Sequence, residues 1–280
     1  MFRYCIFIPI GILSLILVGC DLLLPDRIIK GMESTYSTTF NGITIYANNK
    51  VDPEFVKSTI EALKLSEKVN NQYLTKTDAP LSIHLMDEKT FDKEFEDYEY
   101  SQGLYYSSNQ QIYIRVEDDI NDLFYFSSIE GSVQNLVAHE YSHFRISEEM
   151  VKEGLEDESI PTWFNEGYCE YVANLVSRKS SPMYDQFSEE IFKSYDALLT
   201  KEEWEANSGD YIQALATVRE FILVGKNDTI QIIFEDVKQG KEWSAILSDF
   251  FKIDIHSDTF VLQIKRKMED FYTEGILFDQ

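Results

Sequence analysis

The sequence predicts an α+β fold: a small lobe with a mixed β-sheet and helices, followed by a mostly α-helical lobe. Alternating polar and apolar residues with β-branched runs are concentrated before residue 117, whereas the later segments repeat apolar residues at helical spacing. The 280 residues include only 6 Pro and 12 Gly, which argues against long disordered segments. About 245 residues remain after the N-terminal segment, a length that fits one domain with two lobes, expected over residues 35–126 and 127–280.

The first lobe is expected to begin with a strand, because residues 40–47 alternate and hold the β-branched run Ile43-Thr44-Ile45. Asp52-Pro53 then suits the start of a helix. Two strand-like segments flank residues 107–110 and predict a hairpin, whose edge either borders a cleft or belongs to an ordinary core. The elements expected here are strands over 40–47 and 81–86, helices over 53–73 and 90–96, and a hairpin of 102–106 with 111–116.

The second lobe is predicted to be helical throughout. Thr200 and Glu203 form a capping-box pattern that marks one helix start. The connector over residues 147–159 is strongly acidic and is expected to be an exposed loop or a short helix. The other helices are expected over 128–149, from 161 onward, 184–199, 211–224, 228–238, 242–251 and 257–272.

The most informative segment is H-E-Y-S-H at residues 139–143, inside the first of these helices. Positions i and i+4 of a helix share a face, so both imidazoles can bind one metal ion. The intervening Glu140 can then serve as general base toward a water molecule that the metal activates. A surface helix carrying these residues by chance is the alternative. The apolar neighbours favour a buried site, because they recur at helical spacing: Val133, Leu136, Val137 and Phe144.

A third protein ligand is expected downstream, because a catalytic zinc ion usually takes three and leaves one position open. Pro161 suits the first turn of a helix that carries Glu166 and Glu170 four residues apart. Like charges at this spacing repel, so their proximity needs a reason. Either Glu166 binds the metal and Glu170 accepts a hydrogen bond from a ligand histidine, or both belong to a solvated acidic face.

These two segments, H-E-x-x-H and W-x-N-E-G-x-x-E-Y, resemble the gluzincin zinc metallopeptidases, and more narrowly the peptidase MA-like group. The resemblance implies that His139, His143 and Glu166 bind one Zn²⁺ per chain. It also implies that Glu140 is the general base and that Glu170 contacts a metal-binding residue and not the metal itself.

The motif-bearing match covers residues 127–176. It implies a zincin-like fold with the active site in the cleft between the lobes, and a peptide or protein as substrate. In such proteins a strand near the cleft can pair with an extended peptide, and residues 103–106 and 112–115 are the candidates here.

Peptide hydrolysis also needs a donor for the oxyanion of the tetrahedral intermediate. Tyr211 occupies a position that resembles the downstream tyrosine of the family, and His256 is the other candidate. His84 lies on a predicted strand and is expected to be structural.

Residues 1–19 are expected to be an export signal, with Arg3 before an apolar stretch that is shorter than a typical membrane-spanning helix. Leu17-Val18-Gly19-Cys20 resembles the bacterial lipobox, which implies cleavage before Cys20 and its diacylation. Two acyl chains give stable anchoring. Residues 20–34 would then be a tether, and the domain would lie at the cell membrane on its extracytoplasmic face. An uncleaved N-terminal anchor is the alternative, with the same location.

Cysteine usage and charge limit the other roles. Cys5 leaves with the signal and Cys20 is lipidated, so Cys169 remains alone, as a buried structural thiol or as a fourth metal ligand. The formal charge is −24, and the loss of Arg3 makes it −25. Such an acidic domain is not expected to bind nucleic acid.

Three functions remain: a membrane-anchored zinc metallopeptidase, a catalytically silent zinc-binding module for peptides or proteins, and a structural lipoprotein without metal. The intact Glu140 favours the first.

Overall fold

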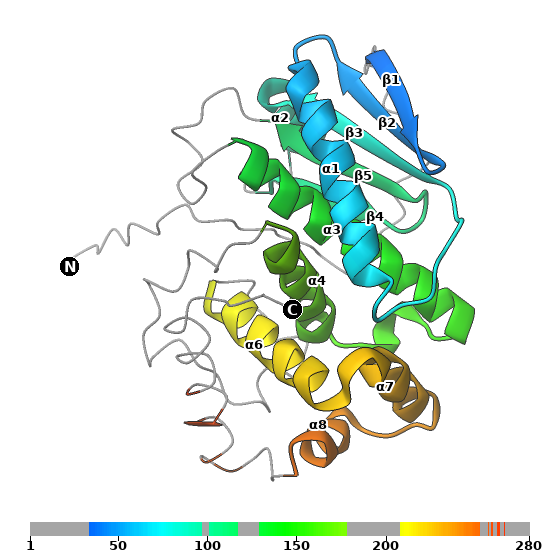
Figure 1. The fold of residues 1–280 in the computed structure, drawn as a ribbon, viewed down its shortest axis with the longest axis vertical. Helices are drawn as coiled ribbons and strands as arrows, with labels where there is room; N and C mark the ends of the chain where they lie inside the picture. Colours follow the sequence, from blue (N-terminus) through cyan, green and yellow to red (C-terminus); the bar gives the residue numbers. More distant parts are fainter. Residues whose placement is uncertain are drawn as a thin grey trace, which may run out of the picture.

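The computed structural model describes residues 34–96, 101–116, 129–177 and 208–252, with a few isolated positions from 257 to 266. A five-stranded sheet with the order β1-β2-β3-β5-β4 forms one end, and helices fill the rest (Figure 1). Its strands are β1 Ser34–Phe40, β2 Ile43–Asn48, β3 Leu81–Asp87, β4 Gly103–Tyr106 and β5 Gln111–Val116. The β2–β3 and β3–β5 pairs are parallel and the two outer pairs are antiparallel, so the sheet is mixed as expected.

The strand expected over residues 40–47 is confirmed as β2, but it begins at Ile43, because a tight turn at Asn41-Gly42 separates it from β1. Both turn residues have positive φ, 47° and 84°, as a two-residue hairpin loop requires. Asn-Gly is the strongest short hairpin signal in a sequence. The sequence prediction did not use this turn signal and therefore missed β1.

Helices α1 (Pro53–Asn70) and α3 (Ile129–Glu153) cover one face of the sheet. Alternation places one set of strand side chains against them. These buried residues include Ile45, Ile83, Leu85, Ile112 and Ile114. The short α2 (Glu88–Glu94) follows β3, and its Phe91 packs on the opposite face with Met86, Leu104 and Tyr113.

The helical part is built on α4 (Thr162–Ser177), with α6 (Ser208–Gly225), α7 (Thr229–Lys238) and α8 (Trp243–Phe251). One apolar core joins these helices to α3. Gly167 permits the close approach of α4 to α6, since a Cβ there would lie 2.5 Å from the carbonyl oxygen of Ala214. The architecture confirms the α+β prediction.

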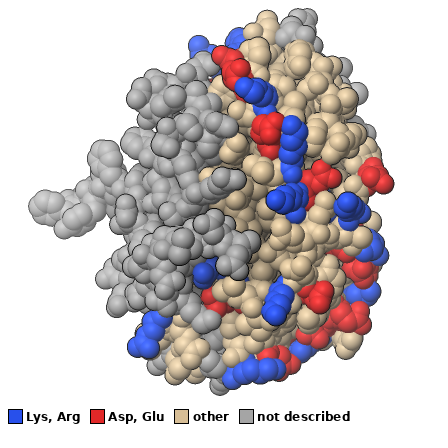
Figure 2. Space-filling model, viewed as in Figure 1, with Lys and Arg blue, Asp and Glu red and all other residues tan. Residues whose placement is uncertain are grey.

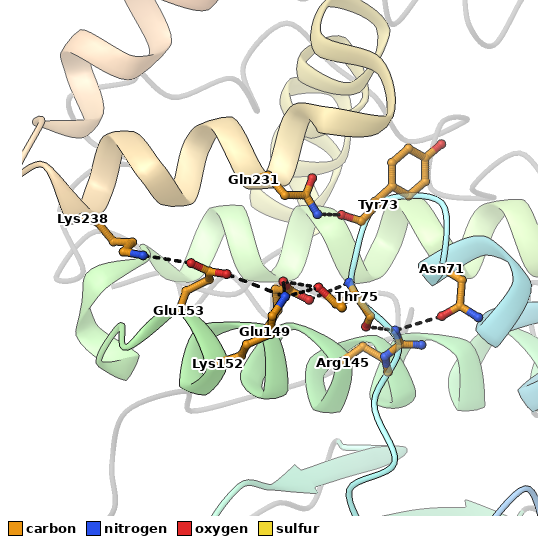
Figure 3. A network of polar contacts seen from close by, with 9 residues as sticks. All are labelled: Asn71, Tyr73, Thr75, Arg145, Glu149, Lys152, Glu153, Gln231 and Lys238. Carbon is orange, nitrogen blue, oxygen red and sulfur yellow. Dashed lines mark hydrogen bonds and ion pairs between the residues drawn. The ribbon is translucent and has the colours of Figure 1, made fainter.

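A polar network holds the second half of α3 against its neighbours (Figure 3). Arg145 is almost fully buried and donates to the backbone oxygen of Thr75 at 2.6 Å and to Asn71 Oδ1 at 3.0 Å. Glu149 accepts from the N–H and the hydroxyl of Thr75. Lys238 of α7 reaches Glu153 at 2.9 Å. The segment after α1 is thereby fixed to the helix that carries the H-E-x-x-H motif.

The acidic connector meets its expectation in part: residues 154–159 are largely exposed and contain a short helix, whereas residues 147–153 belong to α3. Helix α3 continues to Glu153, and Gly154, with φ of 70°, follows its end. A short 3-10 helix, η3 (Asp157–Ser159), then leads to α4. The helices expected over 184–199 and from Thr200, and most of 257–272, lie outside the described residues.

Two further observations concern the surface charges and the helices of the described residues. On the face that Figure 2 shows, basic and acidic side chains are interspersed rather than gathered by sign. Among the described residues, no helix combines the length and apolar character needed to cross a membrane. Cys20 and the expected signal and tether lie almost entirely before the described part.

Candidate metal centre

The H-E-x-x-H helix lies between the two apolar cores. One stripe of α3, with Leu136, Val137 and Phe144, packs under the sheet, and another, with Ala138 and Ile146, packs on the helical core. The motif residues lie among these stripes and are themselves buried. This arrangement explains why a segment with two histidines and a glutamate is held in the centre of the molecule.

The structure brings His139, His143 and Glu166 together. The Nε2 atoms of His139 and His143 are 3.1 Å apart. Glu166 Oε2 lies 3.3 Å from His139 Nε2 and 3.6 Å from His143 Nε2. All three side chains are almost fully buried. Each offers one ligand atom to a common point, so the triad can bind a metal ion.

The Nδ1 atom of each histidine faces a hydrogen-bond acceptor. His139 Nδ1 lies 3.1 Å from Glu170 Oε1, and His143 Nδ1 lies 3.1 Å from Asn165 Oδ1. An amide or carboxylate oxygen can only accept, so each Nδ1 carries the hydrogen. In neutral rings both Nε2 atoms then present lone pairs to each other and to Glu166. Metal-binding histidines are normally held in this way.

This donor set fits a metal ion. Three electron-rich atoms that converge in a buried space repel one another unless a cation lies among them. Ligands bonded to zinc at about 2.0–2.1 Å in tetrahedral geometry are about 3.4 Å apart, close to the three separations seen here. Among the described residues, neither oxygen of Glu166 makes a hydrogen bond of ordinary geometry.

Electrostatics distinguish the carboxylates from the histidines. Burial alone would raise the pKa of Glu166, but His143 and His139 beside it hold that pKa below its usual value. Burial would lower the pKa of His139, but the carboxylates of Glu166 and Glu170 beside the ring raise it well above its usual value. The centre is therefore an anionic site that stabilises positive charge.

Glu140 is fully buried beside the triad. Burial raises its pKa; the two histidines oppose this change, and Glu166 and Glu170 add to it. Neither of its oxygens has a hydrogen-bond partner among the described residues. Its carboxylate lies directly over Gly103 of β4, where a Cβ would be 2.7 Å from Oε1. A carboxylate with a raised pKa and no partner is suited to exchange a proton.

The other residues singled out in the sequence lie outside the metal triad or outside the described residues. Tyr211 lies buried near the start of α6, and its pKa is raised well above the usual value by burial and then by Glu166 and Glu170. Cys169 is buried on α4, with Sγ 3.8 Å from Asn165 Oδ1 and outside the metal triad. His84 lies on β3, where its ring stacks with those of Tyr46 and Tyr113. His256 lies outside the described residues.

Sequence reasoning missed two residues that support the centre. Asn165 precedes Glu166 in the same N-E-G motif, so its position was visible although its partner, His143, was not. Asn70, at the end of α1, accepts from the Tyr168 hydroxyl at 2.9 Å and donates to Ser142 Oγ at 3.2 Å. It thus joins the two helices that carry the triad.

Comparison with known proteins adds little about function. No protein-family model matches the chain. It is similar to the "Uncharacterized protein YhcO" of Bacillus subtilis (strain 168), with 28% identity over 116 residues. The match covers 38% of this chain and only 33% of that protein. The candidate function therefore depends on the geometry of the site.

Proposed function

We propose that this protein is a zinc metallopeptidase of the zincin type that hydrolyses peptide bonds. The convergence of His139 Nε2, His143 Nε2 and Glu166 Oε2 at 3.1–3.6 Å, with both Nδ1 atoms already engaged, carries the proposal. Two neutral histidines and one carboxylate form a donor set typical of catalytic zinc, which retains an open coordination position. When bound, zinc would polarise the scissile carbonyl and lower the pKa of a water molecule at the site to about 7.

Glu140 is the general base in this proposal. It takes the proton from the attacking water and returns it to the leaving amine, and burial with a raised pKa favours both transfers. Glu170 and Asn165 hold the two imidazoles in the tautomer whose Nε2 is free of hydrogen. Tyr211 is protonated in this environment and would donate to the developing oxyanion.

The substrate would pair with the outer edge of β4. Arg115 N donates to Gln102 O at 2.8 Å, so in the antiparallel register Gly103 and Tyr105 turn their backbone groups away from β5. No other described strand pairs with this edge. An extended peptide could use it through backbone hydrogen bonds, which set little side-chain preference. Gly103, which belongs to this edge strand, lies against the side chain of Glu140.

The decisive test is zinc content and peptide turnover on the same samples of the full-length chain, purified in a mild detergent. Glu166→Ala should lose zinc and turnover together. Glu140→Gln should keep zinc and lose about 10²–10⁴-fold in kcat. Glu61→Gln, on the exposed face of α1, is the matched control and should change neither.

Each outcome distinguishes the candidates. Stoichiometric zinc without turnover of any peptide pool would support a silent zinc-binding module instead. Absence of zinc from the wild-type protein would exclude the metal centre. Tyr211→Phe tests the oxyanion donor, with an expected loss of about 10²-fold in kcat and unchanged zinc content.

The proposed location is the extracytoplasmic face of the cell membrane, with the lipid anchor on Cys20. The support is the short apolar stretch that ends in Leu17-Val18-Gly19-Cys20. Intact-mass measurement should detect diacylation, and Cys20→Ser should release the protein from the membrane fraction. Wild-type protein that stays unmodified would contradict the anchor without affecting the metal centre.

A further inference from the structure

We infer that Gly103 is a positioning residue for Glu140: its missing side chain creates the space that the carboxylate occupies. The catalytic meaning of this contact depends on the function proposed above, but the contact itself does not. The sequence gives no local reason for glycine here, since its φ is not among the positive values and β4 is a regular strand. Glycine within a strand often marks a close approach of another group.

The contact is tight on two sides. A Cβ on residue 103 would lie 2.7 Å from Glu140 Oε1, 2.9 Å from its Cγ, and 2.9 Å from Leu136 Cδ1. Real Cβ atoms essentially never approach other atoms within 3.0 Å. Leu136 and Glu140 are four residues apart and share one face of α3. Glu140 therefore lies between its own helix neighbour and the backbone of β4.

The strand has little freedom to retreat. Gly103 and Leu104 pair with Ile114 and Tyr113 of β5. Tyr105 packs its ring on Phe144 of α3, with centroids 6.2 Å apart. The Ser101 hydroxyl donates to the Gly103 carbonyl at 2.6 Å. A side chain at position 103 would therefore displace the Glu140 carboxylate before it displaced the strand.

This displacement would affect proton transfer more than metal binding. Glu140 makes no hydrogen bond among the described residues that could restore its position. The triad is held separately, by Glu170 and Asn165. A general base that is misplaced by about 1 Å can lose about 10²-fold in rate.

The first test is a double-mutant cycle on thermal unfolding of the zinc-loaded, full-length chain. Gly103→Ala should lower Tm by roughly 5 °C when Glu140 is present, and by less than about half of that in the Glu140→Ala background. Ile83→Val, in the sheet core, is the control and should cost the same in both backgrounds. An equal loss from Gly103→Ala in both backgrounds overturns the inference.

A Gly103→Ala variant that fails to fold leaves the test intact. Folding regained in Gly103→Ala/Glu140→Ala supports the inference, and failure of the double variant contradicts it.

The second test is kinetic. Gly103→Ala should lower kcat by about 10²-fold, with KM changed by less than about threefold and zinc retained. Unchanged kcat in a folded, zinc-loaded variant overturns the positioning role. Lack of turnover by the wild-type protein refutes the peptidase proposal instead, and the unfolding cycle still decides the contact.

Discussion

His84 and the pair His139–His143 show two opposite surroundings for histidine in one molecule. His84 is partly buried, whereas His139 and His143 are almost fully buried. His84 is stacked between Tyr46 and Tyr113, with ring centroids 5.0 and 4.9 Å away, and neither of its nitrogens has a hydrogen-bond partner among the described residues. His139 and His143 have acceptors on each Nδ1 and a shared carboxylate facing each Nε2.

The consequence is an opposite response to protons. Burial lowers the pKa of His84 to about 4, whereas the surrounding carboxylates raise that of His139 well above its usual value. Burial alone therefore does not distinguish the candidate metal-binding histidines from His84. What distinguishes them is that electron-rich atoms from α3 and α4 converge at one point, because such a cluster stabilises a bound cation.

The largest expected difference between the two regions is in zinc-linked stability. A ligand at 1,000 times its Kd stabilises the folded state by about 4 kcal/mol. Adding a chelator to zinc-loaded protein should remove this stabilisation in the wild type and in His84→Phe. In His139→Phe the chelator should have no effect. Calorimetric unfolding with and without chelator measures the difference, and a chelator effect that persists in His139→Phe would place the metal elsewhere.

A smaller effect is expected from the acceptors behind the ligands. Glu170→Ala should weaken zinc affinity by about 10–100-fold, because His139 loses the group that fixes its tautomer. Asn165→Ala should cost less, since a neutral acceptor makes the weaker hydrogen bond. Competition with a metal-sensing dye measures both, beside Glu61→Ala on the exposed face of α1. Equal affinities in all of these variants would show that the acceptors do not support the centre.

Local patterns were sufficient to predict much of this architecture. The helices with strong apolar periodicity lie close to their expected ranges, with α7 at Thr229–Lys238 and α8 at Trp243–Phe251. The errors arose where a turn signal was passed over. At Asn41-Gly42 the expected strand was begun three residues too early, and β1 before the turn was missed. Helix α3 was expected to end at Glu149 but continues to Glu153, and Gly154, which follows it, was the signal for its end.

The candidate site was predictable to the extent that its residues lie in short motifs. H-E-x-x-H and N-E-G contain the triad, and helical spacing explains why His139 and His143 meet. The contact of Gly103 with Glu140 and the bridge from Asn70 to Ser142 and Tyr168 join segments far apart in the chain. Such contacts depend on tertiary packing, which no local period in one sequence contains.

The smallest effect concerns acid stability and isolates His84. Its pKa is about 4 in the folded protein and about 6.5 in the unfolded chain, so below pH 6.5 the unfolded chain takes up the proton first. The stability that depends on neutral His84 is complete above pH 6.5 and is lost progressively as the pH falls toward 4. At pH 5 this loss is about 2 kcal/mol.

His84→Phe keeps the ring stack with Tyr46 and Tyr113 but removes the titrating group. Its free energy of unfolding should therefore decline less steeply than that of the wild type between pH 6.5 and 4. Denaturant unfolding of metal-free protein across this range measures the slope and keeps zinc release out of the comparison. Parallel slopes for the two proteins would mean that His84 takes up a proton as readily in the folded sheet as in the unfolded chain. The contrast with His139 would then be one of charge partners alone, without a contribution from burial.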